Sequence, residues 1–180
     1  MPSFIPAFAA LDRDEGKYSN RKEDSGGETY RGISRVHWPL WEGWERVDDW
    51  KRNGRFPANL ETDAELQRLV EKFYRQEYWL PAFDRLPSQA LANKMLSFCV
   101  VAGKPPAVKA LQFGIRACSG QRLEPDGVLG PKTEAAVKAC DATQLLVAVR
   151  CEMACHFRLV AQRRPKDLMF LGGWLTRAYA

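Results

Sequence analysis

Apolar residues recur at helical spacing along most of the chain, and this pattern predicts a mainly α-helical protein. Phe4, Phe8 and Leu11 mark a first helix that begins after Ser3. Residues 16–32 then place glycines among polar side chains, which is typical of an exposed loop or a small hairpin. Strand patterns are nearly absent elsewhere, so we expect β-structure only after the first helix.

The later helices are predicted from their boundary residues. Thr62 to Glu65 has the Thr-x-x-Glu pattern of a capping box and predicts a helix to about Tyr78. Gly103 to Pro106 predicts a break. The other expected helices span residues 88–101, 107–118, 143–162 and 168–179, with one more beginning at Pro131. This order predicts two helical lobes, 1–83 and 84–180, packed as one compact unit.

Composition and charge exclude several classes of protein. A chain of 180 residues, 46% of them hydrophobic, is long enough to form a core without disulfides. It has no apolar run near the roughly 20 residues that a membrane span needs. The net charge is +5, and the surplus lies in residues 104–180, with 12 Lys and Arg against 6 Asp and Glu. An anionic polymer is therefore the expected partner, and the lack of a recognition motif argues against nucleic acid.

The five cysteines are odd in number and form no Cys-x-x-Cys pair. With only two histidines in the chain, no zinc-binding spacing is present. We therefore expect buried, reduced thiols, no metal site and no organic cofactor.

Two carboxylates stand in unlike surroundings. Glu15 lies one helical step beyond Leu11, in line with the apolar stripe, so burial should disfavour its charged form. Asp24 follows in a polar, glycine-rich segment and should stay ionised. Cleavage of a glycosidic bond uses such a pair, one to protonate the leaving oxygen and one to order water or stabilise positive charge. An ordinary helix end followed by a loop gives the same pattern, and both interpretations stay open here.

The neighbouring residues fit the first interpretation. The Thr29 hydroxyl can hold a water molecule, and Gly26 and Gly27 permit a tight turn that leaves room for a sugar chain. The tryptophans allow two interpretations. Trp50, Trp79 and Trp174 are expected in the core or between lobes, whereas Trp38, Trp41 and Trp44 fit core packing and sugar stacking equally well.

The segment from Glu15 to Ile33 resembles the Glu-Gly-Gly-Tyr … Asp-x-Gly-Gly-x-Thr-x-x-Gly-Ile signature of glycoside hydrolase family 108. This is an N-acetylmuramidase family that includes secretion-activator muramidases and phage endolysins. Three later segments are similar to that family in the same order: 74–81, a predicted peptidoglycan-binding region at 104–133, and a closing segment at 170–178.

The resemblance implies a lysozyme-like fold and hydrolysis of the β-1,4 bond between N-acetylmuramic acid and N-acetylglucosamine. Glu15 would be the general acid, and Asp24 with Thr29 would order the attacking water. The expected substrate contacts are Tyr18, Gly26, Gly27, Tyr30, Trp38 and Trp41. Inversion is favoured over retention, and a lytic transglycosylase product stays open.

Some residues depart from the family pattern and support a rival hypothesis. Lys17 replaces the second glycine after Glu15, Ser97 stands where aspartate is usual, and Val101 stands where asparagine is usual. A non-catalytic peptidoglycan-binding or secretion-associated protein that keeps the muramidase fold is therefore the alternative.

The N-terminus has no basic leader and does not resemble a Sec signal peptide. We expect a monomer made in the cytoplasm that acts in the periplasm or cell wall after non-classical export. Its partners would be peptidoglycan strands and a holin or secretion machinery. A phage and a secretion-system origin fit equally well.

Overall fold

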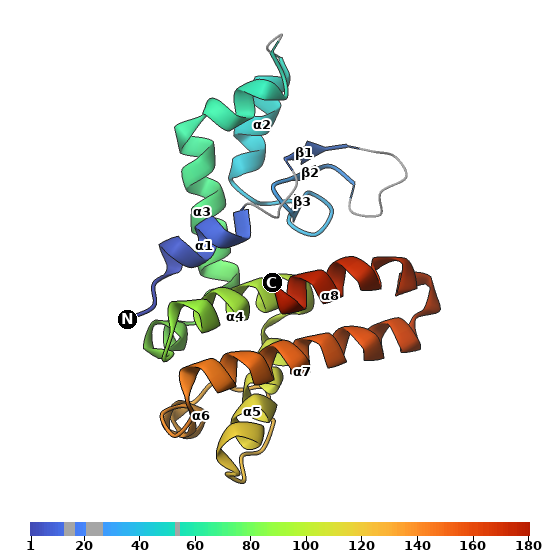
Figure 1. Ribbon diagram of the computed structural model, residues 1–180. Coiled ribbons are helices and arrows are strands. Elements are labelled where there is room, and N and C mark those ends of the chain that lie inside the picture. Colours follow the sequence, from blue (N-terminus) through green and yellow to red (C-terminus); the bar gives the residue numbers. More distant parts are fainter. Residues whose placement is uncertain (13–16, 21–26, 53–54) are drawn as a thin grey trace. The chain divides into compact units, whose positions relative to one another are not determined.

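The structure is a computed structural model that describes residues 1–12, 17–20, 27–52 and 55–180 (Figure 1). Helices dominate this part of the chain, and the β-structure within it is a small antiparallel sheet. The predicted mainly α-helical class is confirmed. Within the described residues, no helix is long and apolar enough to cross a membrane.

The chain divides into two compact units. The sheet unit comprises Phe8–Glu77, and the helical unit comprises Met1–Ala7 together with Tyr78–Ala180. Helix α1 (Phe4–Asp12) therefore contributes its first residues to the helical unit and the rest to the sheet unit.

The sheet unit contains three two-residue strands, β1 (Tyr18–Ser19), β2 (Thr29–Tyr30) and β3 (Ile33–Ser34), in the order β1-β2-β3. Tyr30 pairs with Tyr18 on one side and with Ile33 on the other. The turn between β2 and β3 is short because Arg31 and Gly32 both adopt positive φ angles, of 43° and 76°. Two such residues are the signature of a tight hairpin turn that follows the strand twist.

The remaining elements of the sheet unit are helical: α2 (Gly43–Lys51), the 3₁₀ helix η1 (Ala58–Thr62) and α3 (Ala64–Tyr78). The buried face of α3 carries Leu66, Leu69, Val70, Phe73 and Tyr74, as its apolar periodicity predicts. Tyr74 also donates a hydrogen bond of 2.7 Å to the carbonyl of Arg31, which ties the hairpin turn to this helix.

The helical unit is built around α7 (Ala142–Arg163), which packs against α4 (Gln89–Ala102), α5 (Lys104–Ser119) and α8 (Leu171–Tyr179). The shorter elements are η2 (Pro81–Arg85), α6 (Pro131–Val137) and η3 (Pro165–Phe170). Side chains with no exposed surface fill the centre of this unit; they include Leu91, Met95, Leu96, Phe98, Leu111, Ile115, Leu145, Val149 and Met153.

Helix boundaries differ from the sequence prediction, and the helix expected over 168–179 begins only at Leu171, after η3. The cap of α3 is Asp63, whose Oδ1 accepts the N–H of Leu66 at 2.9 Å, whereas Thr62 ends η1 and donates to the carbonyl of Asn59. The predicted break over residues 103–106 is Gly103 alone, because Pro105 and Pro106 fit the first turn of α5, where backbone N–H groups have no helical partner.

The expectation of buried thiols is wrong for most of the cysteines. Cys99 is buried, Cys118, Cys140 and Cys155 are partly exposed, and Cys151 is exposed on α7. All five are free thiols. The apolar face of α7 turns toward α5 and α8, and position 151 lies away from it.

Candidate functional site

Four of the predicted site residues lie on or next to strands β1 and β2: Tyr18, Gly27, Thr29 and Tyr30. Tyr18 and Thr29 are partly exposed, and the Thr29 hydroxyl donates to the carbonyl of Gly27 at 3.2 Å. Gly27 has a φ of +60°, and a Cβ there would approach Val36 to 2.9 Å. Glycine is therefore needed at position 27 for the backbone path itself.

Glu15, Asp24 and Gly26 lie outside the described residues. Their predicted roles therefore stay predictions.

Tyr30 is fully buried, and its hydroxyl is held by α3 and η1. It donates toward the carbonyl of Leu60 at 3.3 Å and accepts from Gln67 Nε2 at 2.8 Å. Burial raises the pKa of Tyr30, and the hydrogen bond from Gln67 opposes that shift. Tyr30 has no exposed surface and connects the sheet to η1 and α3. A direct contact between its ring and a sugar does not fit this placement.

A charged cluster that the sequence did not reveal borders the sheet. Glu28 accepts a hydrogen bond from the Tyr18 hydroxyl at 3.0 Å and pairs with Lys51 at 2.6 Å and Arg35 at 3.2 Å. Arg35 and Lys51 also pair with Asp48, both at 2.8 Å. Because Glu28 already has three partners, its carboxylate fixes the sheet to α2 and is not placed to transfer protons.

The cluster changes the acidity of its members. Hydrogen bonds from Arg35, aided by Lys51, lower the pKa of Asp48 to about 2. Burial raises the pKa of Tyr18, and the adjacent Glu28 carboxylate raises it further. Tyr18 is thus a hydrogen-bond donor at neutral pH.

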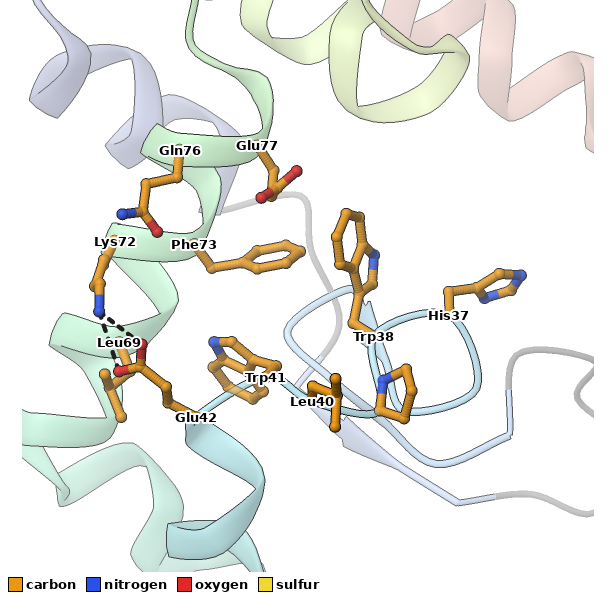
Figure 2. A pocket seen from close by; sticks show the side chains of 11 residues that line it. His37, Trp38, Leu40, Trp41, Glu42, Leu69, Lys72, Phe73, Gln76 and Glu77 are labelled. Atoms are coloured by element: carbon orange, nitrogen blue, oxygen red, sulfur yellow. Dashed lines mark hydrogen bonds and ion pairs between the residues drawn. The ribbon is translucent and has the colours of Figure 1, made fainter.

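An aromatic cavity of about 360 Å³ lies beside the sheet, between the 37–42 segment and α3 (Figure 2). Trp38 and Trp41 face Phe73 and Glu77 of α3 across it, and Leu69 closes one side. Trp38 meets Phe73 edge to face, with ring centroids 5.0 Å apart, and Trp41 does the same at 6.2 Å. The size and lining match a site for part of an organic ligand.

Polar groups line the same cavity. Glu42 and Lys72 form an ion pair of 2.7 Å at one end, and Gln76 and Glu77 lie along α3 (Figure 2). The Glu77 carboxylate makes no hydrogen bond or ion pair with any residue of the described ranges. The Trp41 Nε1 is buried and has no acceptor among those residues. An apolar wall with a few hydrogen-bonding groups is the composition expected of a small-molecule site.

The tryptophans fall into two groups. Trp44 and Trp79 are buried, and Trp50 is partly exposed and donates its indole N–H to Asp63 at 2.7 Å. Trp38 and Trp41 are partly exposed and line the cavity. Sequence reasoning missed their partners on α3 because Phe73 and Glu77 lie more than 30 positions further along the chain. Over the ranges that are described, no group of His, Cys, Asp and Glu residues could hold a metal ion.

Comparison with known proteins places this geometry in a family. A family model described as Glycosyl hydrolase 108 matches residues 8–103, and one described as Predicted Peptidoglycan domain matches residues 106–179. The solved structure of Brucella abortus SagA is similar, with a TM-score of 0.63 and 25% identity over 98% of this chain and 89% of that one. No curated protein matches the chain.

The helical fold, the small sheet and the two matched segments define a lysozyme-like glycoside hydrolase class directed at peptidoglycan. The chain belongs to the glycosyl hydrolase 108 family.

Proposed function

We propose that the protein is an N-acetylmuramidase that hydrolyses the β-1,4 bond between N-acetylmuramic acid and N-acetylglucosamine. The observation that carries this proposal is the Glu15 … Asp24 … Thr29 pattern, which lies entirely within the segment matched to the glycosyl hydrolase family. Glu15 protonates the leaving glycosidic oxygen. Asp24, with the Thr29 hydroxyl, orders the water that attacks the anomeric carbon and takes up its proton.

The aromatic cavity of the sheet unit also supports this proposal. The ring faces of Trp38 and Trp41 suit the apolar face of a pyranose, and Gln76 and Glu77 suit its hydroxyl groups. We assign the cavity to one sugar of the bound strand. Tyr18, whose hydroxyl oxygen can accept a hydrogen bond while its O–H donates to Glu28, and Gly27 are the other substrate contacts near the sheet.

The second matched segment supports a binding function separate from catalysis. Residues 106–179 match a predicted peptidoglycan domain and carry the basic surplus of the chain. We propose that they hold the enzyme on the wall polymer in the periplasm or cell wall. Export through a holin or secretion machinery and the monomeric state stay predictions.

The test uses Glu15→Gln, which keeps the shape of the side chain and removes the acid. Loss of general acid catalysis should slow clearing of a peptidoglycan suspension by about 10²- to 10⁴-fold. Glu45→Gln on the exposed side of α2 is the matched control and should clear at the wild-type rate.

The products separate the alternatives. Mass spectrometry of released fragments should show reducing N-acetylmuramic ends; anhydro ends would indicate a lytic transglycosylase. Binding to insoluble peptidoglycan without release of reducing ends by the wild type would support the non-catalytic rival. A Glu15→Gln variant as fast as the wild type would overturn the assigned acid.

A further inference from the structure

Three consecutive large apolar side chains are exposed at the turn between α7 and α8. Leu168, Met169 and Phe170 of η3 are 60%, 79% and 50% exposed. This turn forms the end of the α7–α8 hairpin, drawn in dark orange to red (Figure 1). Single exposed apolar residues are ordinary on protein surfaces, but three exposed ones in succession at one turn indicate a surface that contacts something.

Three basic residues come just before this apolar group in the chain. Arg163, Arg164 and Lys166 are all exposed, and Asp167 is the one acidic residue among them. None of the three basic side chains forms an ion pair with a residue of the described ranges. We call Arg163, Arg164, Lys166, Leu168, Met169 and Phe170 the hairpin patch.

The hairpin patch has firm support from the helices beneath it. The Phe170 ring lies 6.0 Å from Trp174 of α8, and Trp174 stacks on the buried Phe157 of α7 at 5.3 Å. Because Phe170 already packs against Trp174, the patch can stay exposed without rearrangement of the core.

We propose that the hairpin patch docks onto the surface of an anionic phospholipid bilayer. Exposed apolar side chains beside unpaired cations are the two elements of interfacial lipid binding, one entering the acyl boundary and the other attracted to the headgroups. A polysaccharide would pair with the cations but would offer Leu168 and Met169 no apolar surface to pack against. A second copy of the chain would bring like charges together. The contact lies at the surface, since no described helix spans a bilayer.

The test is co-sedimentation of the full chain with vesicles of phosphatidylcholine, with and without phosphatidylglycerol. These vesicles contain no glycan, so the result does not depend on the proposed muramidase activity. We expect binding to the anionic vesicles that weakens as salt is added, and little binding to pure phosphatidylcholine.

Two triple variants separate the contributions. Arg163→Gln with Arg164→Gln and Lys166→Gln should lower the partition coefficient by about a hundredfold, since each cation near an anionic surface contributes roughly fivefold. Leu168→Ser with Met169→Ser and Phe170→Ser should lower it by more than about tenfold at equal charge.

The control carries Arg122→Gln, Lys132→Gln and Lys138→Gln, which removes the same charge elsewhere in the helical unit. It should bind as the wild type does. Equal loss in this control would show that net charge alone acts, and would overturn the proposal. Unchanged binding in either patch variant would overturn it as well. So would a dimer, measured by light scattering, that the serine variant dissociates.

Discussion

The indole ring of Trp41 lies nearly parallel to the phenol ring of Tyr30, with centroids 6.5 Å apart and an angle of 23° between the planes. Tyr30 belongs to β2, next to Thr29, and Trp41 lines the aromatic cavity. The wall of the cavity is thus supported by the strand that carries the proposed water-holding threonine. The hydroxyl of Tyr30 is in turn hydrogen-bonded to Leu60 and Gln67, which connects the strand to η1 and α3.

Trp38 is the residue through which ligand binding in the cavity can be tested. Trp38→Ala should weaken binding of a Glu15→Gln background protein to insoluble peptidoglycan by about tenfold, because a ring face for sugar stacking is lost. Its backbone bond to Ser34 remains, so the segment keeps its path. Glu45→Ala, on the exposed side of α2 and outside the cavity lining, is the control and should bind normally. Equal binding by Trp38→Ala would remove the cavity from the substrate site.

Asp63 is the residue whose loss should most destabilise the sheet unit. Its carboxylate is nearly buried and accepts four hydrogen bonds, from Arg46 twice, from Trp50 and from the N–H of Leu66, at 2.7 to 3.0 Å. Burial alone would raise its pKa, but these bonds outweigh burial and lower it. Asp63→Ala should lower the free energy of unfolding in urea by about 3 kcal/mol, through loss of a helix cap and of the hydrogen bonds that Arg46 and Trp50 donate to a buried carboxylate.

The control for that variant is Glu65→Ala, two residues further on, which breaks an exposed pair with Arg68. Its unfolding curve should superimpose on that of the wild type, because exposed pairs contribute little. Equal effects of the two substitutions would contradict the role given to Asp63.

The Glu28–Asp48 cluster predicts acid sensitivity. The pKa of Asp48 falls from 3.8 to about 2 in the folded protein. A carboxyl group with a lowered pKa stabilises the fold at every pH above its ordinary pKa. That contribution is lost as the pH falls from 3.8 to about 2. Asp48→Asn should therefore lower Tm at neutral pH, and the Tm difference from the wild type should shrink toward zero near pH 2. A Tm difference that stays constant down to pH 2 would contradict the role given to Asp48.

Gln112 should control the order of the 120–130 loop. The side chain is buried; Nε2 donates to Asp126, the carbonyl of Val128 and Thr133 at 2.7 to 3.1 Å, and Oε1 accepts the N–H of Gly127 at 2.9 Å. Gln112→Ala should cost about 2–4 kcal/mol and speed cleavage of the loop in limited proteolysis. Gln121→Ala, exposed in the same loop, should leave the cleavage rate as it is.

The cysteines should react with a thiol reagent in an order set by burial. Cys151 is exposed and should react first in the folded protein. Cys99 is buried, and burial raises its pKa to about 12, so it should react only on unfolding. Titration with Ellman's reagent before and after addition of guanidinium measures this directly. Modification of Cys99 at the rate of Cys151 would contradict the packing of α4.

The sequence predicted those elements whose signal is local. The faces of α3, α4 and α5 follow from apolar periodicity, and Ser88 and Pro131 mark helix starts as expected. Helix α2 was not predicted, because its tryptophans and charges show no clean apolar stripe. The cap of α3 was misplaced by one residue because Asp63 is held by Arg46 and Trp50, which no local pattern connects to it.

The candidate site divides in the same way. The local cluster that contains Trp38 and Trp41 is visible in the sequence, but the place of Phe73 and Glu77 opposite them depends on the fold. Glu28 was missed because its role depends on Arg35 and Lys51, which only the folded chain brings to it. Tyr30 resembled a binding residue by its place in a motif, and its burial by α3 could not be deduced from that motif.

The single-residue junction at Gly103 bears on how this protein could be divided. The matched family segments meet there, at residues 103 and 106, yet α4 before the junction packs against both α5 and α7 after it. A fragment ending at residue 103 would leave Met95, Leu96 and Phe98 facing water. A cut at this junction therefore divides one core, and engineers who swap wall-targeting modules should keep the whole helical unit, Met1–Ala7 with Tyr78–Ala180, together.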